Sequence, residues 1–280
     1  MPSPISRSLT YLLAALYALT GAVLWLFPEQ LAPVFAWKVS PFVTMTIGGW
    51  CLGNAWLAWV NARRWQWGLI YTSLLYLWTF GVLEAGVLLV FRANLKLGHP
   101  IAWLYLATLV INLLGAIAGF ADWLRLHPKP LASGPAAPRS AWFATLAFLL
   151  FVGFLGLYGL FAPNGAAGTR GGIFPEVMSN FTLRSFGAFY FALAITVAPL
   201  LGKGRNPANY LHHGFAAFGL IVFITAAAFV YIGLFDFVHR PGGLAYFGAY
   251  LIAGIPLLLV FLRFGTGDRM APATQGARAS

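Results

Sequence analysis

The sequence predicts an all-α integral membrane protein whose eight transmembrane helices form two four-helix repeats. The 280-residue chain is 60% hydrophobic and only 8% charged, whereas a soluble domain carries about 25% charged residues. Its apolar residues gather in eight segments, each near the roughly 20 residues that a helix needs to cross a bilayer. A linker rich in proline separates the first four segments from the last four.

The eight segments are predicted as helices because their apolarity is continuous, whereas the strands of a membrane barrel alternate apolar and polar residues. The first segment is interpreted as a helix and not as a cleaved signal peptide, since its apolar run is long and no small-residue cleavage site follows it. The predicted helices lie near residues 9–27, 42–60, 67–91, 101–123, 141–162, 181–201, 211–237 and 242–264.

The linker at residues 124–140 is rich in Pro, Ala and Ser and marks a boundary between a repeat at 1–123 and a repeat at 141–264. Each half reads helix, long loop, helix, basic turn, helix, short turn with proline, helix. Because four crossings return the chain to its starting side, the halves should share one orientation about a pseudo-two-fold axis along the membrane normal. The tail at 265–280 is expected to be disordered. Identities at one constant offset accompany the layout: Phe35 and Phe174, Ser40 and Ser179, Phe42 and Phe181, Gly48 and Gly187, Ala55 and Ala194.

Most of the 17 Lys and Arg residues lie on the side of the predicted bundle that holds both termini and the linker. The positive-inside rule therefore predicts cytoplasmic termini, and the short loops favour a bacterial inner membrane. Membrane lipids are the expected partners of these basic residues, which meet anionic headgroups between apolar spans. Nucleic acid is not expected as a partner, despite the net charge of +11.

Glu84 is the one acid deep inside an apolar segment, "YTSLLYLWTFGVLEAGVLLVF". The helical rise predicts that it lies about 10 Å below the outer boundary of the membrane. An ionised carboxylate facing lipid there would cost on the order of 2–3 kcal/mol. Glu84 should therefore face the bundle interior, be neutral or have a partner. Arg184 is the expected partner and Arg92 the alternative, so a structural Glu84–Arg184 clasp competes with a functional role.

A polar vestibule on the outer side is the predicted binding site. Four of the six acids, Glu29, Glu84, Glu176 and Asp236, fall on outer loops or outer helix halves, although exposed loops need no special reason to be polar. Trp50 and Trp78 lie deeper than the other tryptophans and could line a pocket, while His212 and His213 are expected at the membrane interface. The candidate residues of the vestibule are Glu84, Arg184, Arg92, Asp236, His99, His239, Trp78 and Trp50.

No nucleotide, phosphate, zinc or serine-hydrolase motif occurs, and the single cysteine, Cys51, provides no metal site. No cofactor is indicated. The sequence favours most a non-catalytic membrane protein that binds a hydrophobic molecule (lipid, quinone or pigment) or is a subunit of a larger membrane complex. The second is a small secondary transporter with its site between the repeats and Glu84 as the proton- or cation-sensitive group. A lipid-acting enzyme ranks last, because no nucleophile is evident.

Overall fold

The computed structural model describes residues 2–127, 139–163, 173–202 and 206–264, and it contains no strand within those ranges. The linker interior, part of the loop after residue 163 and the tail at 265–280, on which sequence predictions were made, lie outside the described residues. The first half contains α1 (Pro4–Leu26), α2 (Pro28–Leu31), α3 (Pro41–Arg63), α4 (Trp67–Val90) and α5 (Pro100–Leu126), and the second half contains α6 (Arg139–Phe161), α7 (Asn180–Leu201), α8 (Pro207–Val230) and α9 (Gly242–Phe264). Three single 3₁₀ turns join them: η1 (Ala32–Val34), η2 (Arg92–Asn94) and η3 (Ile232–Leu234).

Seven helices of the described chain are long and apolar enough to span a membrane: α1 and α4 to α9. This confirms the prediction of an all-α membrane protein, but apolarity identifies seven spans and not the expected eight. The exception is α3, which is 23 residues long yet carries Thr, Asn and Gly. Most of α3 is buried, against α1, α8 and α4, and a helix that other helices surround does not need the apolarity of a lipid-facing helix.

Polar capping residues and prolines define the first residues of several helices, which the apolar runs alone do not fix. The side chains of Ser3, Ser40, Ser179 and Asn206 accept hydrogen bonds from backbone N–H groups in the first turns of α1, α3, α7 and α8. Such side chains satisfy N–H groups that have no partner within the helix. Proline follows the cap in three of these helices, where its missing N–H does no harm.

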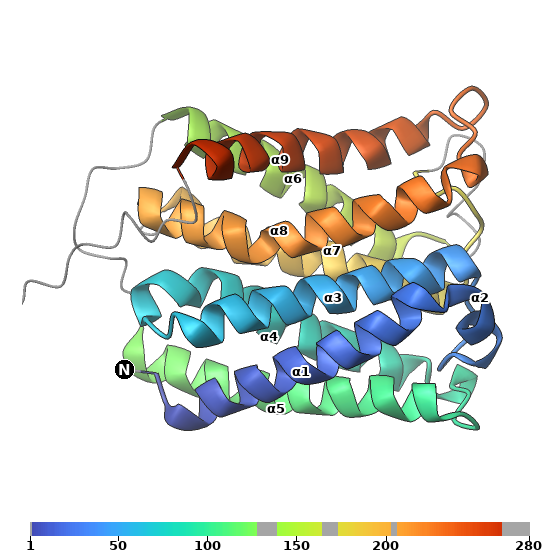
Figure 1. Ribbon diagram of the computed structural model, residues 1–280, viewed down its shortest axis with the longest axis horizontal. Helices are drawn as coiled ribbons and strands as arrows, with labels where there is room; N and C mark the ends of the chain where they lie inside the picture. The colour runs from blue at the N-terminus through green and yellow to red at the C-terminus, as the bar shows by residue number, and fades with distance from the viewer. Residues whose placement is uncertain (1, 128–138, 164–172, 203–205, 265–280) are drawn as a thin grey trace, which may run out of the picture.

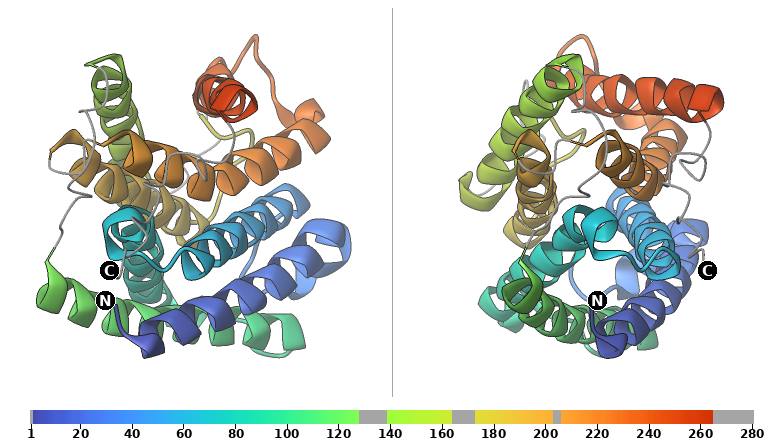
Figure 2. Two further views of the ribbon diagram at one scale, coloured as in Figure 1. Left: turned by 60° about the vertical axis from the view of Figure 1, so that its left-hand side comes forward. Right: turned by 90° about the vertical axis from the view of Figure 1, so that its left-hand side faces the viewer.

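The long helices form one antiparallel bundle (Figure 1). α3, α4, α7 and α8 occupy its centre, where α3 packs against α8, α4 against α7 and α4 against α8. α1 packs on α3 and α5, while α6 packs on α7 and α9 on α8 (Figure 2). We call the end that holds the N-terminus the basic end, and the end that holds residues 27–40, 91–99, 173–179 and 231–241 the loop end.

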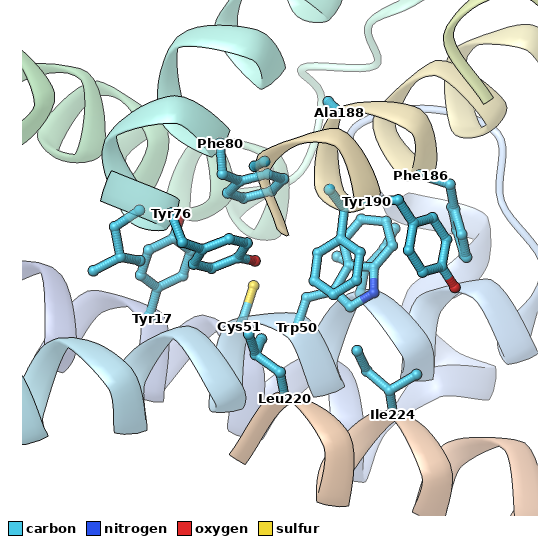
Figure 3. Packing of buried hydrophobic residues seen from close by; sticks show 14 of the residues in the cluster. Tyr17, Trp50, Cys51, Tyr76, Phe80, Phe186, Ala188, Tyr190, Leu220 and Ile224 are labelled. Carbon is cyan, nitrogen blue, oxygen red and sulfur yellow. The ribbon is translucent and has the colours of Figure 1, made fainter. Parts of the chain in front are cut away.

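Aromatic rings fill the middle of the bundle (Figure 3). The rings of Trp50 on α3 and Phe189 on α7 stack with centroids 4.8 Å apart and planes 8° apart. Phe186 and Phe80 meet the Trp50 ring edge-on, at 4.6 Å and 6.4 Å. Stacked and edge-on ring pairs stabilise a core beyond the area they bury, so this aromatic contact holds the two halves together.

Candidate functional site

Glu84 is fully buried, with 0% of its surface exposed, although its helix crosses the apolar part of the bundle. Its Oε1 atom accepts hydrogen bonds from the Tyr105 hydroxyl of α5 (3.0 Å) and from the Ser185 hydroxyl of α7 (2.9 Å). Its Oε2 atom is also buried and has no hydrogen-bond partner among the described residues. One carboxyl oxygen of Glu84 therefore accepts a hydrogen bond from each half of the chain, and the other has no partner among the described residues.

Arg184, the expected partner of Glu84, hydrogen-bonds elsewhere. Its guanidinium donates to the carbonyl of Gly159, in the last turn of α6, and to that of Ala162, just beyond it, both at 2.7 Å. These carbonyls lie where an α-helix has no N–H groups left to satisfy them, and a cation is favourable there. Arg92 lies in η2 and is exposed at the loop end. In the part of the chain that the structure describes, no ion pair to Glu84 forms.

Further polar groups lie inside the first four-helix half, and together with Glu84 they form what we call the interior polar cluster. The Asn112 amide of α5 donates to the Tyr17 hydroxyl of α1 at 2.8 Å. Asn54 of α3 lies close to the hydroxyls of Tyr17 and Tyr76, but not in hydrogen-bonding geometry. Figure 3 shows Tyr17 and Tyr76 beside Cys51 in this interior. The members of the cluster are Tyr17, Asn54, Tyr76, Glu84, Tyr105 and Asn112.

The cluster holds several open atoms, a term we use for buried side-chain N or O atoms without a hydrogen-bond partner among the described residues. They are both amide atoms of Asn54, the Tyr76 hydroxyl, Oδ1 of Asn112 and Oε2 of Glu84. An unsatisfied buried polar group costs about 1–3 kcal/mol, and such groups in proteins usually meet ordered water or a ligand. Because the core of a helix bundle is a common place for a binding site, we treat this cluster as the candidate site.

The remaining residues of the predicted vestibule do not gather around Glu84. Asp236 pairs with His239 at 2.8 Å on the exposed loop end, and His99 lies exposed just before α5. Trp50 lies in the aromatic core, while Trp78 stacks near Trp67 at the basic end, with ring centroids 6.3 Å apart. Of the eight candidates, Glu84 alone belongs to the interior polar cluster.

Two glutamates of the loop end also make defined contacts. The Ser40 hydroxyl donates a hydrogen bond to Glu176, whose burial raises the pKa of its carboxyl above the usual value. Tyr231 donates to Glu29 at 2.9 Å. Both contacts join the first half to the second, so these acids link the two halves at this end.

Several members of the site could not be identified from the sequence. Tyr17, Tyr76 and Tyr105 were not singled out, because tyrosines are frequent in this chain and only the packing shows which ones face inward. His212 and His213 lie in the first turns of α8, at the basic end, and are 2% and 8% exposed. Their rings face other helices, and His212 contacts Asn61 of α3.

These features define a polytopic, all-α membrane protein with an acid-containing polar cluster inside a helix bundle. No group of three or more potential metal-binding His, Cys, Asp or Glu side chains occurs within the described residues. No protein-family model, curated protein or solved structure matches the chain.

Proposed function

We propose that this protein is a small secondary transporter in which Glu84 binds and releases a proton or a small cation. The observation that carries the proposal is the open Oε2 atom of a fully buried carboxyl, set among other open atoms of the interior polar cluster. Acids inside a membrane bundle characteristically mark ion or proton pathways. A bulky hydrophobic ligand fits this interior less well, because aromatic rings already fill the neighbouring core.

The charge state of Glu84 links binding of the proton or cation to the conformation of the protein. Protonated, the carboxyl is neutral and still accepts the hydrogen bonds from Tyr105 and Ser185. Ionised, it is a buried charge stabilised by two hydroxyls alone, a state that favours entry of water or a cation. A conformation that admits water is therefore favoured after the proton leaves, and differential binding to two conformations is what drives transport.

The proposed architecture behind this function is eight crossings in two equivalent four-helix repeats. α3 supplies the eighth crossing, since its 23 residues span about 35 Å at the helical rise. In the alignment of the halves, α1 corresponds to α6, α3 to α7, α4 to α8, and α5 to α9. The central contacts agree with this alignment. Exchanging the two halves turns the contact between α3 and α8 into the contact between α7 and α4, and both contacts are present.

Close glycine contacts support the same alignment. A Cβ atom placed on Gly48 would lie 2.6 Å from the backbone nitrogen of Trp25, and one on Gly187 would lie 2.4 Å from the backbone nitrogen of Leu160. Gly48 and Gly187 are equivalent at the offset of 139. The contacts align α1 with α6 at an offset of 135, which pairs Trp25 with Leu160. Backbones pack this closely in membranes where small residues permit it.

Aromatic contacts across the two halves add independent support. Phe42 meets Tyr231 at a centroid distance of 5.8 Å, and their equivalents Phe181 and Phe91 meet at 5.3 Å. The stacked pair of the core, Trp50 and Phe189, joins two equivalent positions, as expected for residues beside a pseudo-two-fold axis. With this architecture, the basic end, where α1 begins and α9 ends, faces the cytoplasm of a bacterial inner membrane.

A second candidate function, binding of a hydrophobic molecule or of a partner membrane subunit, is favoured by the outer face of the second half. In the first half α1 packs on α5, and Thr20 hydrogen-bonds Thr108 there at 3.0 Å. α6 and α9 make no comparable contact over their described residues (Figure 2), and the positions equivalent to the two threonines hold Leu155 and Ala249. An apolar molecule would find only apolar groups at these two positions.

The test of the transporter is gradient-driven uptake. Wild-type protein and Glu84→Gln are reconstituted in liposomes, exposed to a pooled metabolite extract under an inward proton gradient, and the vesicle contents are compared by mass spectrometry. We expect at least one compound to accumulate with wild type and not with Glu84→Gln. Glu29→Gln, a change at the loop end, is the matched control and should transport normally. If wild type accumulates nothing beyond protein-free liposomes, the proposal is overturned.

A further inference from the structure

A second buried polar group lies at the basic end, where α3, α4 and α8 meet. Nε2 of His212 lies 2.9 Å from Oδ1 of Asn61. The Asn61 amide nitrogen donates to the Leu57 carbonyl at 2.8 Å, and the Ser73 hydroxyl donates to Oδ1 at 2.7 Å. None of these contacts was expected from the sequence, and the proposed function so far makes no use of them.

The hydrogen bonds determine where His212 carries its proton. The Leu57 carbonyl can only accept, so it fixes the nitrogen of the Asn61 amide on its side and directs Oδ1 toward the imidazole. Since an amide oxygen can only accept as well, Nε2 of His212 must be the protonated ring nitrogen. The lone pair then resides on Nδ1, which is an open atom.

Nδ1 is therefore the ring atom that can accept a proton. The imidazolium formed would keep its Nε2–H bond to Oδ1 of Asn61, which becomes charge-assisted and stronger. Burial of the ring is the main effect that disfavours a positive charge on His212. Among the described residues, Arg64 and the adjacent His213 disfavour it further, so a proton taken up at Nδ1 is readily released. Leu257 of α9, which contacts the start of α8 at Gly214, is apolar and adds no charge.

Polar residues continue from this group toward Glu84 along the contact between α3 and α4. On α3, Asn61, Asn54 and Cys51 share one face, because they are seven and three residues apart. On α4, Ser73 and Tyr76 share a face in the same way. The two helices run antiparallel from the contact between Ser73 and Asn61, so Asn54 and Tyr76, farther along each helix, are placed between that contact and the level of Glu84. Both residues carry open atoms. Buried water bridging such atoms is common in proteins.

We infer that His212 is a second proton-binding site, through which Glu84 exchanges protons with the basic end of the bundle. The inference rests on the proposed function of Glu84. The chemical step is the addition of a proton to Nδ1 of His212 and its release from the same atom, and no other bond forms or breaks. Water bound between Asn54 and Tyr76 carries the proton to and from Oε2 of Glu84.

The test follows the protonation of Glu84 from each side separately. Wild-type protein is reconstituted in one orientation in liposomes, the pH is lowered on one side, and the infrared band of the protonated carboxyl is recorded with time. His212→Gln keeps a donor for Asn61 and is expected to slow protonation from the basic end by about tenfold or more, as removal of a positioned acid–base group does. Protonation from the loop end should keep its wild-type rate. His99→Gln, an exposed change at the loop end, is the control and should alter neither rate.

The outcomes separate the two proposals. If the carboxyl band of Glu84 forms in wild type and His212→Gln leaves both rates unchanged, the role of His212 is overturned while that of Glu84 stands. If no band is lost in Glu84→Gln, the carboxyl does not titrate and both proposals are overturned. Histidine nitrogen NMR in nanodiscs provides a second readout, in which Nδ1 of His212 should gain a proton as the pH falls, and Asn61→Leu should weaken that response.

Discussion

The hydrogen bonds to Glu84 predict a sharp difference between two substitutions at this position. Glu84→Gln keeps an oxygen that can accept from Tyr105 and Ser185, and its amide nitrogen occupies the place of the open Oε2. Glu84→Leu instead leaves two buried hydroxyls without an acceptor. Each unsatisfied donor costs about 1–3 kcal/mol, with membrane proteins at the lower end of such ranges. Glu84→Leu should therefore be less stable than Glu84→Gln by about 2 kcal/mol or more.

The assay is reversible unfolding in bicelles or mixed micelles, with the free energy of unfolding measured for each variant. A rescue variant makes this assay more specific. Tyr105→Phe and Ser185→Ala, added to Glu84→Leu, remove the two hydroxyls that lack an acceptor and should recover most of the lost free energy of unfolding. Replacing every partner by an apolar group is close to neutral, whereas removing one partner is not. Equal stability of Glu84→Leu and Glu84→Gln, or absence of rescue, would refute the assigned hydrogen bonds.

Three further predictions concern packing, pH and helix ends. Gly187→Ala should lower the thermal midpoint because its Cβ meets the α6 backbone at 2.4 Å, while Gly86→Ala, where nothing lies within 4 Å, should not. The pKa of Glu176 is raised by burial, so its contribution to stability is present at low pH and is lost as the pH rises through that raised pKa; Glu176→Gln should remove this part of the pH dependence of the midpoint. Arg184→Met should destabilise the end of α6, with a loss of about 1.5–3 kcal/mol from the bonds of a charged donor, and the exposed Arg92→Met serves as its control in the same unfolding assay.

Most of the helices could be predicted from the sequence, since continuous apolar runs of the right length have few alternatives in a membrane. The exception, α3, shows the limit of that rule. Its Thr44, Thr46, Asn54 and Asn61 side chains are all fully buried. A helix that is mostly covered by other helices can carry such polar residues on its buried faces, which lowers its mean hydropathy below that of a helix with a wide lipid-facing side.

The interior placement of Glu84 could also be predicted, but its partner could not. Charge complementarity favoured Arg184, whereas the residue that reaches the carboxyl is the next one, Ser185. Adjacent residues of a helix point about 100° apart, so the rotation of α7 about its axis decides between a salt bridge and a hydrogen bond. Such a rotation follows from the packing of α7 against both α4 and α6, which no single segment of sequence encodes.

In the proposed repeat, the position equivalent to Glu84 is occupied by Ile224, a fully buried apolar residue. In a symmetric pair of identical chains every side chain occurs twice, so an acid inside one chain means an acid inside the other. Two halves joined in one polypeptide can differ at equivalent positions. One half can then keep an acid while the other holds an apolar residue, so in the proposed transporter Glu84 would supply one proton site per chain where a symmetric pair of chains would supply two.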